Sequence, residues 1–230
     1  MPRTARKLVD GSTYHVLTRG NNNQPVFHHD ADFQRYLHLL GMYTFRHGLK
    51  LFHYVLMPNH VHLVFQIPHG SALSSAMLGL SLAYALFYRK RYCYRGHLWQ
   101  GRFKSLLIET DRHVLACGRY VELNPVLAGL VQDPSAYLWS SYRAHAIGAE
   151  NPLATRSSAY ESLGLTASER QYHYRRLMLE EMNAPRAPSP ATPGAIRIMP
   201  VPARTLEDIL GLTKAKSPRA NKIPVASHEQ

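Results

Sequence analysis

Residues 56–68, LMPNHVHLVFQIP, decide the fold of this chain and carry its first chemical signal. After Pro58 the apolar and β-branched residues predict a short buried strand. Side chains in a strand alternate between two faces, so His60 and His62 point the same way and the apolar residues between and after them point the other way. The strand rise places the two imidazoles about 6–7 Å apart, which allows them to hold one divalent cation.

The segments around this strand predict the rest of a sheet. The apolar run at 50–57 meets the histidine strand through a tight connection at Pro58 and Asn59, which predicts a hairpin. Residues 13–18, TYHVLT, and 103–109, FKSLLIE, have the composition of two further strands.

Three helices are expected between and after these strands. One begins at Asp30 and is ended by Gly48, a second covers 72–91, and a third covers 111–123. The third should stop before Pro125, because the residue before a proline avoids the α-helical region. The resulting order, β-α-β-β-α-β and then a helix, predicts an α+β, ferredoxin-like fold. Its antiparallel sheet is expected to carry helices on one face and leave the other face free for a site.

Composition divides the chain into three parts. Residues 1–145 contain every expected strand and form the main domain, and 146–182 predict a helical extension. Eight of the 15 prolines follow Asn183, so 183–230 is expected to be a mostly disordered tail with a short helical piece near 205–212.

The charge of the chain points to a polyanionic partner. Its 27 Lys and Arg residues exceed 15 Asp and Glu residues, giving a net charge of +12, and nucleic acid is the leading partner. No apolar run approaches the roughly 20 residues that span a bilayer, and the N-terminus lacks the apolar segment of a secretory signal, so no membrane partner is expected. Two cysteines are too few for a disulfide scaffold, which favours a reducing cytoplasm.

A second chemical signal lies in RYVELNPV, residues 119–126. If the segment before Pro125 is helical, Tyr120 and Asn124 lie one turn apart on the same face, which pairs a potential nucleophile with a potential oxygen ligand. Glu122 is a rival oxygen ligand, but its position two residues from Tyr120 points it away from that face.

Each signal alone has an ordinary structural explanation. Histidines in strands are usually hydrogen-bonded structural residues, Tyr120 can be a core aromatic, and Asn124 can end a helix beside a proline turn. Together with the strand order and the positive charge, they favour cutting single-stranded DNA through a covalent phosphotyrosine. A phosphodiester repels anionic nucleophiles, and a bound metal ion can neutralise that charge.

The expected ligands restrict the metal. Two neutral imidazoles and one amide oxygen hold a cation without cancelling its charge and leave coordination positions for phosphate and water. Because no cysteine is nearby, Mg²⁺ or Mn²⁺ is expected, and imidazole favours Mn²⁺ in affinity.

The chain resembles the IS200-like Y1 transposases of the HUH endonuclease class, and most closely the REP-associated tyrosine transposases. The resemblance implies that His60 and His62 are the HUH histidines, Tyr120 the nucleophile and Asn124 the third metal ligand. The stretches that carry it are collinear within roughly 10–145: YHVLTRGNNNQPVF (14–27), LFHYVLMPNHVHLVF (51–65), HLWQGRFKS (97–105), RYVELNPVLAGLV (119–131) and YLWSSYRAH (137–145).

This resemblance implies metal-dependent cleavage and joining of single-stranded or hairpin DNA, of the REP type, through a 5′-phosphotyrosine intermediate. It makes 1–145 the catalytic domain of a DNA-transposition type enzyme. It also implies a bacterial, nucleoid-associated protein of the cytoplasm that acts as a monomer or a homodimer.

Cationic side chains alternate with aromatic ones between 89 and 104, a pattern that suits a groove for single-stranded nucleic acid with stacking platforms. The expected DNA contacts are Arg19, Arg89, Arg91, Arg95, Arg102 and Lys104.

Two other functions remain open on the sequence. The first is a hairpin-binding protein with this fold and no cleavage activity. The second is a metal hydrolase in which the His-x-His pair holds a cation and its bound hydroxide.

Overall fold

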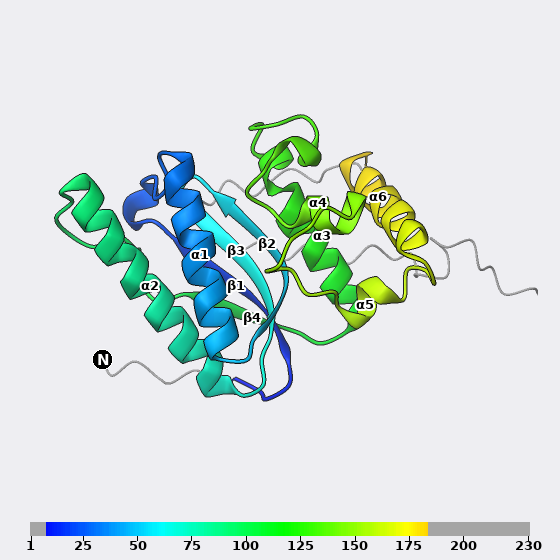
Figure 1. The fold of residues 1–230 in the computed structure, drawn as a ribbon, viewed down its shortest axis with the longest axis horizontal. Helices are drawn as coiled ribbons and strands as arrows, with labels where there is room; N and C mark the ends of the chain where they lie inside the picture. Colours follow the sequence, from blue (N-terminus) through cyan, green and yellow to red (C-terminus); the bar gives the residue numbers. More distant parts are fainter. Residues whose placement is uncertain (1–7, 184–230) are drawn as a thin grey trace, which may run out of the picture.

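The strands of this protein form the expected sheet. The computed structural model describes residues 8–183, and its elements follow the order β-α-β-β-α-β before the C-terminal helices. All neighbouring strands are antiparallel and the sheet order is β2-β3-β1-β4, so the ferredoxin-like α+β prediction is confirmed (Figure 1). The strands are β1 Thr13–Arg19, β2 Lys50–Met57, β3 His60–Gln66 and β4 Lys104–Ile108.

Two helices, α1 Asp30–Arg46 and α2 Gly70–Tyr92, cover one face of the sheet (Figure 1). Val61 and Leu63, which alternate with the two histidines of β3, point into the core beneath these helices, as the strand period requires. The start of α1 is fixed by Asp32, whose Oδ2 accepts the backbone N–H groups of His28 at 2.8 Å and His29 at 3.0 Å.

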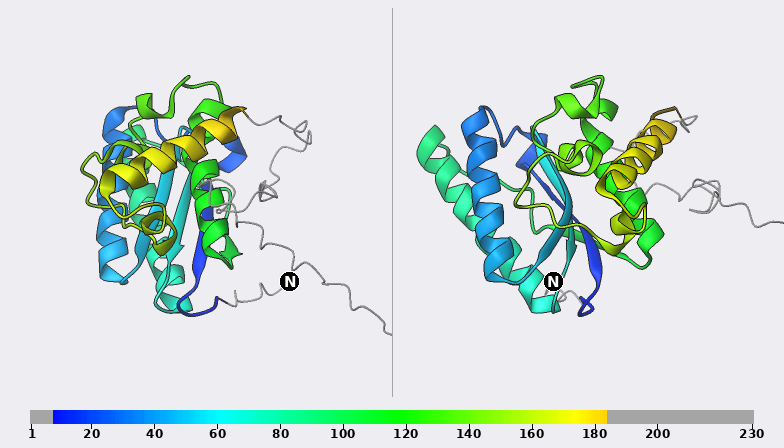
Figure 2. Two further views of the ribbon diagram at one scale, coloured as in Figure 1. Left: turned by 90° about the vertical axis from the view of Figure 1, so that its right-hand side faces the viewer. Right: turned by 45° about the vertical axis from the view of Figure 1, so that its right-hand side comes forward.

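The opposite face is not free, which corrects the expectation from the sequence. Apolar residues on that face, such as Val55 and Val64, need cover, and they pack with Val121 and Tyr174 in a second core. Figure 1 and Figure 2 show the C-terminal helices on this side of the sheet. They are α3 Asp111–Leu127, α4 Tyr142–Ile147, α5 Ser158–Glu161 and α6 Ala167–Asn183, and the 3₁₀ turns are Asn21–Asn23 and Pro134–Ala136.

Helix α3 continues through Pro125 to Leu127, so the prediction that it stops before the proline is wrong. A proline inside a helix removes one N–H and leaves a carbonyl four residues earlier without its usual donor, here that of Val121. The side chain of Asn124 donates from Nδ2 to the carbonyl oxygens of Tyr120 at 2.7 Å and Val121 at 3.4 Å. This side chain therefore replaces part of the lost hydrogen bonding.

Helix α2 also differs from expectation. By length and composition it is apolar enough to cross a membrane, whereas the sequence analysis expected no such run. Small and hydroxyl side chains interrupt the large apolar residues of α2, so the segment was not recognised in the sequence as one long apolar run. Its buried residues, among them Leu73, Met77 and Leu80, pack in the first core, as in a core helix of a globular domain.

The expected main domain and helical extension share the second core. The expected boundary between 145 and 146 falls inside α4, and Leu177 and Met178 of α6 pack with residues of the sheet and α3. The three-part division of the chain stays a prediction. The expected disordered tail lies, apart from Asn183, outside the described residues, as does its short helix.

Candidate active site

Polar side chains gather on the sheet face that α3 covers. In the register of β1 and β3, Arg19 lies opposite His60 and Leu17 lies opposite His62. On the other side of β1, Lys104 of β4 lies opposite Leu17. Because directly paired residues of neighbouring strands share a face, the two histidines, Arg19 and Lys104 all lie on one face of the sheet.

His60 sits between two amide side chains. Its Nδ1 lies 2.6 Å from Oδ1 of Asn59, and its ring also interacts with the side chain of Asn124. Burial first, and then the positive charge of Arg19, lower the pKa of His60 to about 4, so the ring is neutral at pH 7. A neutral ring that donates its Nδ1–H to Asn59 keeps a lone pair on Nε2.

His62 is held by His15, which the sequence analysis did not select. Nε2 of His15 lies 2.8 Å from Nδ1 of His62, and the rings stack with centroids 5.0 Å apart. Burial, followed by the charges of its neighbours, lowers the pKa of His62 well below its usual value, and burial lowers the pKa of His15 to about 4. Strand alternation is the signal in the sequence that could have found His15, because His15 lies on the same face of β1 as Leu17 and Arg19.

Helix α3 presents Tyr120 to these histidines. The Tyr120 ring meets His62 and His15 nearly at right angles, with centroids 5.6 and 6.1 Å away. Asn124, one turn later on the same side of the helix, reaches His60. The fold thus brings together the four residues selected from the sequence as nucleophile and ligands, although they come from segments about 60 residues apart.

Two other tyrosines are poor nucleophiles for this place. Tyr84 donates its hydroxyl to the carbonyl oxygen of Val26 at 2.6 Å inside the first core. Tyr137 donates to the carbonyl oxygen of Leu56 at 2.6 Å. Burial raises the pKa of both phenols, so neither favours the phenolate form.

The side chains of His60, His62 and Asn124 fit a divalent cation by their chemistry. Both rings are neutral, so each keeps one nitrogen lone pair. With Nδ2 of Asn124 engaged by the helix backbone, its Oδ1 is the atom left to face His60. Two imidazole nitrogens and an amide oxygen suit Mn²⁺ or Mg²⁺ rather than a soft metal.

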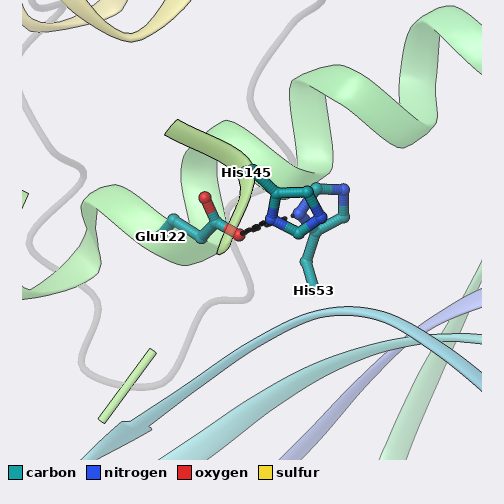
Figure 3. A group of neighbouring side chains, drawn as sticks. All are labelled: His53, Glu122 and His145. Atoms are coloured by element: carbon teal, nitrogen blue, oxygen red, sulfur yellow. Dashed lines mark hydrogen bonds and ion pairs between the residues drawn. The ribbon is translucent and has the colours of Figure 1, made fainter. Parts of the chain in front are cut away.

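A second histidine cluster lies on the far side of α3. His53, Glu122 and His145 are fully buried, and their nitrogen and oxygen atoms lie within 4.8 Å of one another, close enough to hold a metal ion (Figure 3). Nδ1 of each histidine lies 2.9 Å from Oε1 of Glu122. Glu122 therefore points away from Tyr120, as its helix position predicted.

The six expected DNA contacts differ in their surroundings and stay a prediction. Arg91 pairs with the buried Asp32 at 3.2 Å, and Arg89 donates to the carbonyl oxygen of Gly96 at 2.9 Å, so both have structural partners. Arg95 and Arg102 are exposed in the segment between α2 and β4. The remaining two, Arg19 and Lys104, share the sheet face of the histidines.

Comparison with known families agrees with this geometry. The sequence profile described as "Transposase IS200 like" matches residues 8–124, which hold all four strands and the first part of α3 through Asn124. The chain belongs to the IS200-like transposase family. Membership in this family supports a transposase function and a DNA-cleaving enzyme.

One solved structure gives the same fold. The structure of a REP-associated tyrosine transposase bound to a REP hairpin is similar over 68% of this chain and 99% of its own, with 19% identity and a TM-score of 0.54. A candidate transposase from Deinococcus radiodurans R1 covers 49% of this chain and 91% of its own at 18% identity, with a TM-score of 0.37 that is too low to support an argument. A comparison with curated proteins gives no match.

Proposed function

We propose that this protein is a metal-dependent single-strand endonuclease and strand transferase that acts on hairpin DNA through a phosphotyrosine at Tyr120. The observation that carries the proposal is the packing of Tyr120 against His62 and His15, with Asn124 beside His60. A nucleophile and three candidate ligands from α3 and β3 thus meet at one place in a strongly basic chain.

His60, His62 and Asn124 would hold the cation. A divalent ion bound there supplies positive charge at the scissile phosphate, which lowers the repulsion between the phosphate oxygens and an attacking phenol oxygen. The side chains prepare this place without metal: Asn59 fixes the orientation of His60, and the helix backbone fixes Nδ2 of Asn124.

Tyr120 would carry the covalent step. Its oxygen attacks phosphorus, the bond from phosphorus to the 3′ oxygen breaks, the phenol proton leaves to solvent, and the departing 3′ oxygen takes up a proton. The products are a 5′-phosphotyrosine and a free 3′ hydroxyl. Because the phosphodiester bond energy is kept in the phosphotyrosine, a second 3′ hydroxyl can attack it and join the strands.

His15 would act by orienting His62. If Nε2 of His62 binds the cation, Nδ1 must carry the proton and donate it across the 2.8 Å contact to Nε2 of His15. Ligating histidines almost always donate their second ring N–H to a protein acceptor, which fixes the ring orientation and its tautomer.

The proposed DNA path crosses β1 and β4. Arg19 and Lys104 flank the histidines on the same face, and Nε of Arg19 is buried without a hydrogen-bond partner among residues 8–183. A phosphate oxygen would satisfy that donor. The hairpin form of the substrate is proposed from the REP hairpin bound to the similar solved structure.

One assay separates this proposal from its alternatives. Labelled single-stranded hairpin DNA carrying repetitive palindromes is incubated with the protein and Mn²⁺ and resolved on denaturing and native gels. A denaturation-resistant protein–DNA adduct that disappears in EDTA is the expected result. Retarded DNA without an adduct identifies a hairpin-binding protein, and cut DNA without an adduct identifies a hydrolase.

A further inference from the structure

We propose that Glu122 is a positioning residue that locks α3 in the orientation at which Tyr120 and Asn124 meet the histidines of β3. This inference rests on the proposed function, because Glu122 would hold Tyr120 and Asn124 in the positions that the proposed reaction needs. Glu122 lies midway between Tyr120 and Asn124 in sequence, and its side chain is fully buried in the second cluster (Figure 3).

The carboxylate of Glu122 accepts hydrogen bonds from three different elements. His53 of β2 and His145 of α4 donate from Nδ1 to Oε1, each at 2.9 Å. The Ser141 hydroxyl, at the N-cap of α4, donates to Oε1 at 2.6 Å, and the Tyr174 hydroxyl of α6 donates to Oε2 at 2.7 Å. One side chain of α3 is thereby tied to the sheet, to α4 and to α6.

The geometry of the helix makes this tie relevant to the candidate site. At about 100° per residue, Glu122 is rotated by about 200° from both Tyr120 and Asn124. The anchored side of α3 is therefore nearly opposite the side that faces β3. Any rotation or shift of α3 about its anchor moves both the nucleophile and the third candidate ligand.

A second contact fixes the same side of α3. Gly118, one turn before Glu122, lies so close to the ring of His53 that a Cβ atom there would be 2.6 Å from Nε2 and Cε1. The ring of His53 thus touches the helix at Gly118 and bonds it at Glu122. Two contacts four residues apart define both the distance of α3 from β2 and the rotation of α3 about its own axis.

The hydrogen bonds favour a structural anchor over a metal centre in this cluster. A cation would need the Nδ1 lone pairs, and the rings could then no longer donate to Glu122. The other nitrogen of His53, Nε2, has no hydrogen-bond partner in the part of the chain that the structure describes, but it faces Gly118, where the close approach of the helix leaves no space for an ion. The four donors already satisfy the carboxylate.

The test compares single-turnover adduct formation in the full-length protein and three variants at saturating hairpin DNA and Mn²⁺. Glu122→Gln keeps the shape of the side chain but replaces the carboxylate that accepts the four hydrogen bonds. Tyr174→Phe removes one of the four donors. Tyr160→Phe is the matched control: Tyr160 lies in the same core and donates to the carbonyl oxygen of His145 at 2.8 Å, with no bond to Glu122. Each protein gives a rate constant, a burst amplitude, a hairpin Kd and an unfolding midpoint.

A displacement of about 1 Å in a reacting group can cost about 100-fold in rate. We expect Glu122→Gln to lower the rate constant by about that factor and Tyr174→Phe by about 10-fold. In both variants the burst amplitude of the folded protein and the hairpin Kd should be nearly unchanged. Tyr160→Phe should leave the rate constant unchanged, even if it lowers the unfolding midpoint.

Two results would overturn the inference. One is a fall in midpoint or amplitude with normal rate constants, which marks a purely structural role. The other is one equivalent of metal in the purified protein that is lost in Glu122→Gln. Should Glu122→Gln fail to fold, Tyr174→Phe still decides the question. Absence of an adduct in the wild type would instead reject the proposed function.

Discussion

The two histidine clusters on either side of α3 share residue types but differ in their partners. In the buried cluster, His53 and His145 both donate to one carboxylate, and that carboxylate has two further donors. In the candidate active site, the charges that act on His60 and His62 come from Arg19 and from other imidazoles. In the first cluster the carboxylate and both Nδ1 atoms are hydrogen-bonded within the protein, and Gly118 packs against the remaining nitrogen of His53. The second cluster keeps nitrogen lone pairs available.

A group of metal-binding residue types is therefore not by itself a metal site. A carboxylate between two histidines has the composition of one, yet its hydrogen bonds give it a complete structural role. Neutral imidazoles without a carboxylate are prepared for a cation by the orientation of their N–H groups. The predictions below test this contrast between a satisfied cluster and an available one.

The largest expected effect is on cleavage when the available cluster loses a ligand. His60→Ala and His62→Ala should each lower the rate of DNA cleavage by at least about 10³-fold, because the metal supplies several kcal/mol to the transition state. Binding to hairpin DNA should change little in either variant. EDTA should reproduce the loss in the wild type, and full-rate cleavage in EDTA would rule out the metal mechanism.

The next effect is a loss of stability when the buried cluster of His53, Glu122 and His145 loses its carboxylate. Glu122→Ala should lower the free energy of unfolding by about 3–5 kcal/mol, because it leaves buried donors without their carboxylate. Urea denaturation measures this, with His62→Ala as the matched variant of the other cluster. If His62→Ala destabilises the protein as much as Glu122→Ala does, the two clusters are not different in kind.

A smaller effect is expected for the residue that orients a ligand. His15→Ala should weaken Mn²⁺ binding by about 10–100-fold, since the loss of a hydrogen-bond partner to a ligating histidine has that size. Calorimetry or Mn²⁺ paramagnetic resonance without DNA measures it, and His38→Ala, an exposed histidine of α1, is the control. Equal Mn²⁺ affinity in both variants would remove His15 from the site.

The last effect, small when counted per histidine and per pH unit, is a slope in stability with pH. Burial lowers the pKa of His15 and of His60 to about 4, and it also lowers the pKa of His62 and His53. Below about pH 6.5 the unfolded chain then binds more protons than the folded one. Stability is therefore present at neutral pH and falls as the pH drops from about 6.5 towards 4.

This slope can reach about 1.4 kcal/mol per pH unit for each such histidine. Urea midpoints at pH 7.5, 5.5 and 4.5 measure the slope, in EDTA to exclude metal. A His60→Gln/His62→Gln double variant should have a shallower slope. The same slope in both proteins would mean that these two rings are not buried in the neutral form.

Much of the fold could be predicted from local patterns. Strand alternation placed the two histidines of β3 on one face, and helix periodicity placed Tyr120 and Asn124 together, because both depend only on backbone geometry. The predicted end of the third helix was too early, because the rule that helices stop before a proline considers the backbone alone. Repair of the helix by the Asn124 side chain is a specific contact that the rule does not include.

The rest depends on contacts between distant segments. His15 could be assigned to the face of the site only from the pairing of β1 with β3, which the sequence did not supply. Arg91 is expected from the sequence to contact DNA, and the sequence does not reveal that it also pairs with Asp32 of a different helix. The covering of the second face by α3 to α6 depends on which apolar surfaces need burial, and this becomes clear only once the sheet is assembled.

The most direct test of the account is to locate the covalent bond to DNA. After reaction with hairpin DNA and Mn²⁺, nuclease and trypsin digestion should leave a nucleotide on the peptide that begins at Tyr120 and ends at Arg143. Fragmentation in the mass spectrometer should place the nucleotide on Tyr120, and Tyr120→Phe should give no adduct while keeping its hairpin affinity. A nucleotide on Tyr137 or Tyr142 of the same peptide, or an adduct in Tyr120→Phe, would contradict the account.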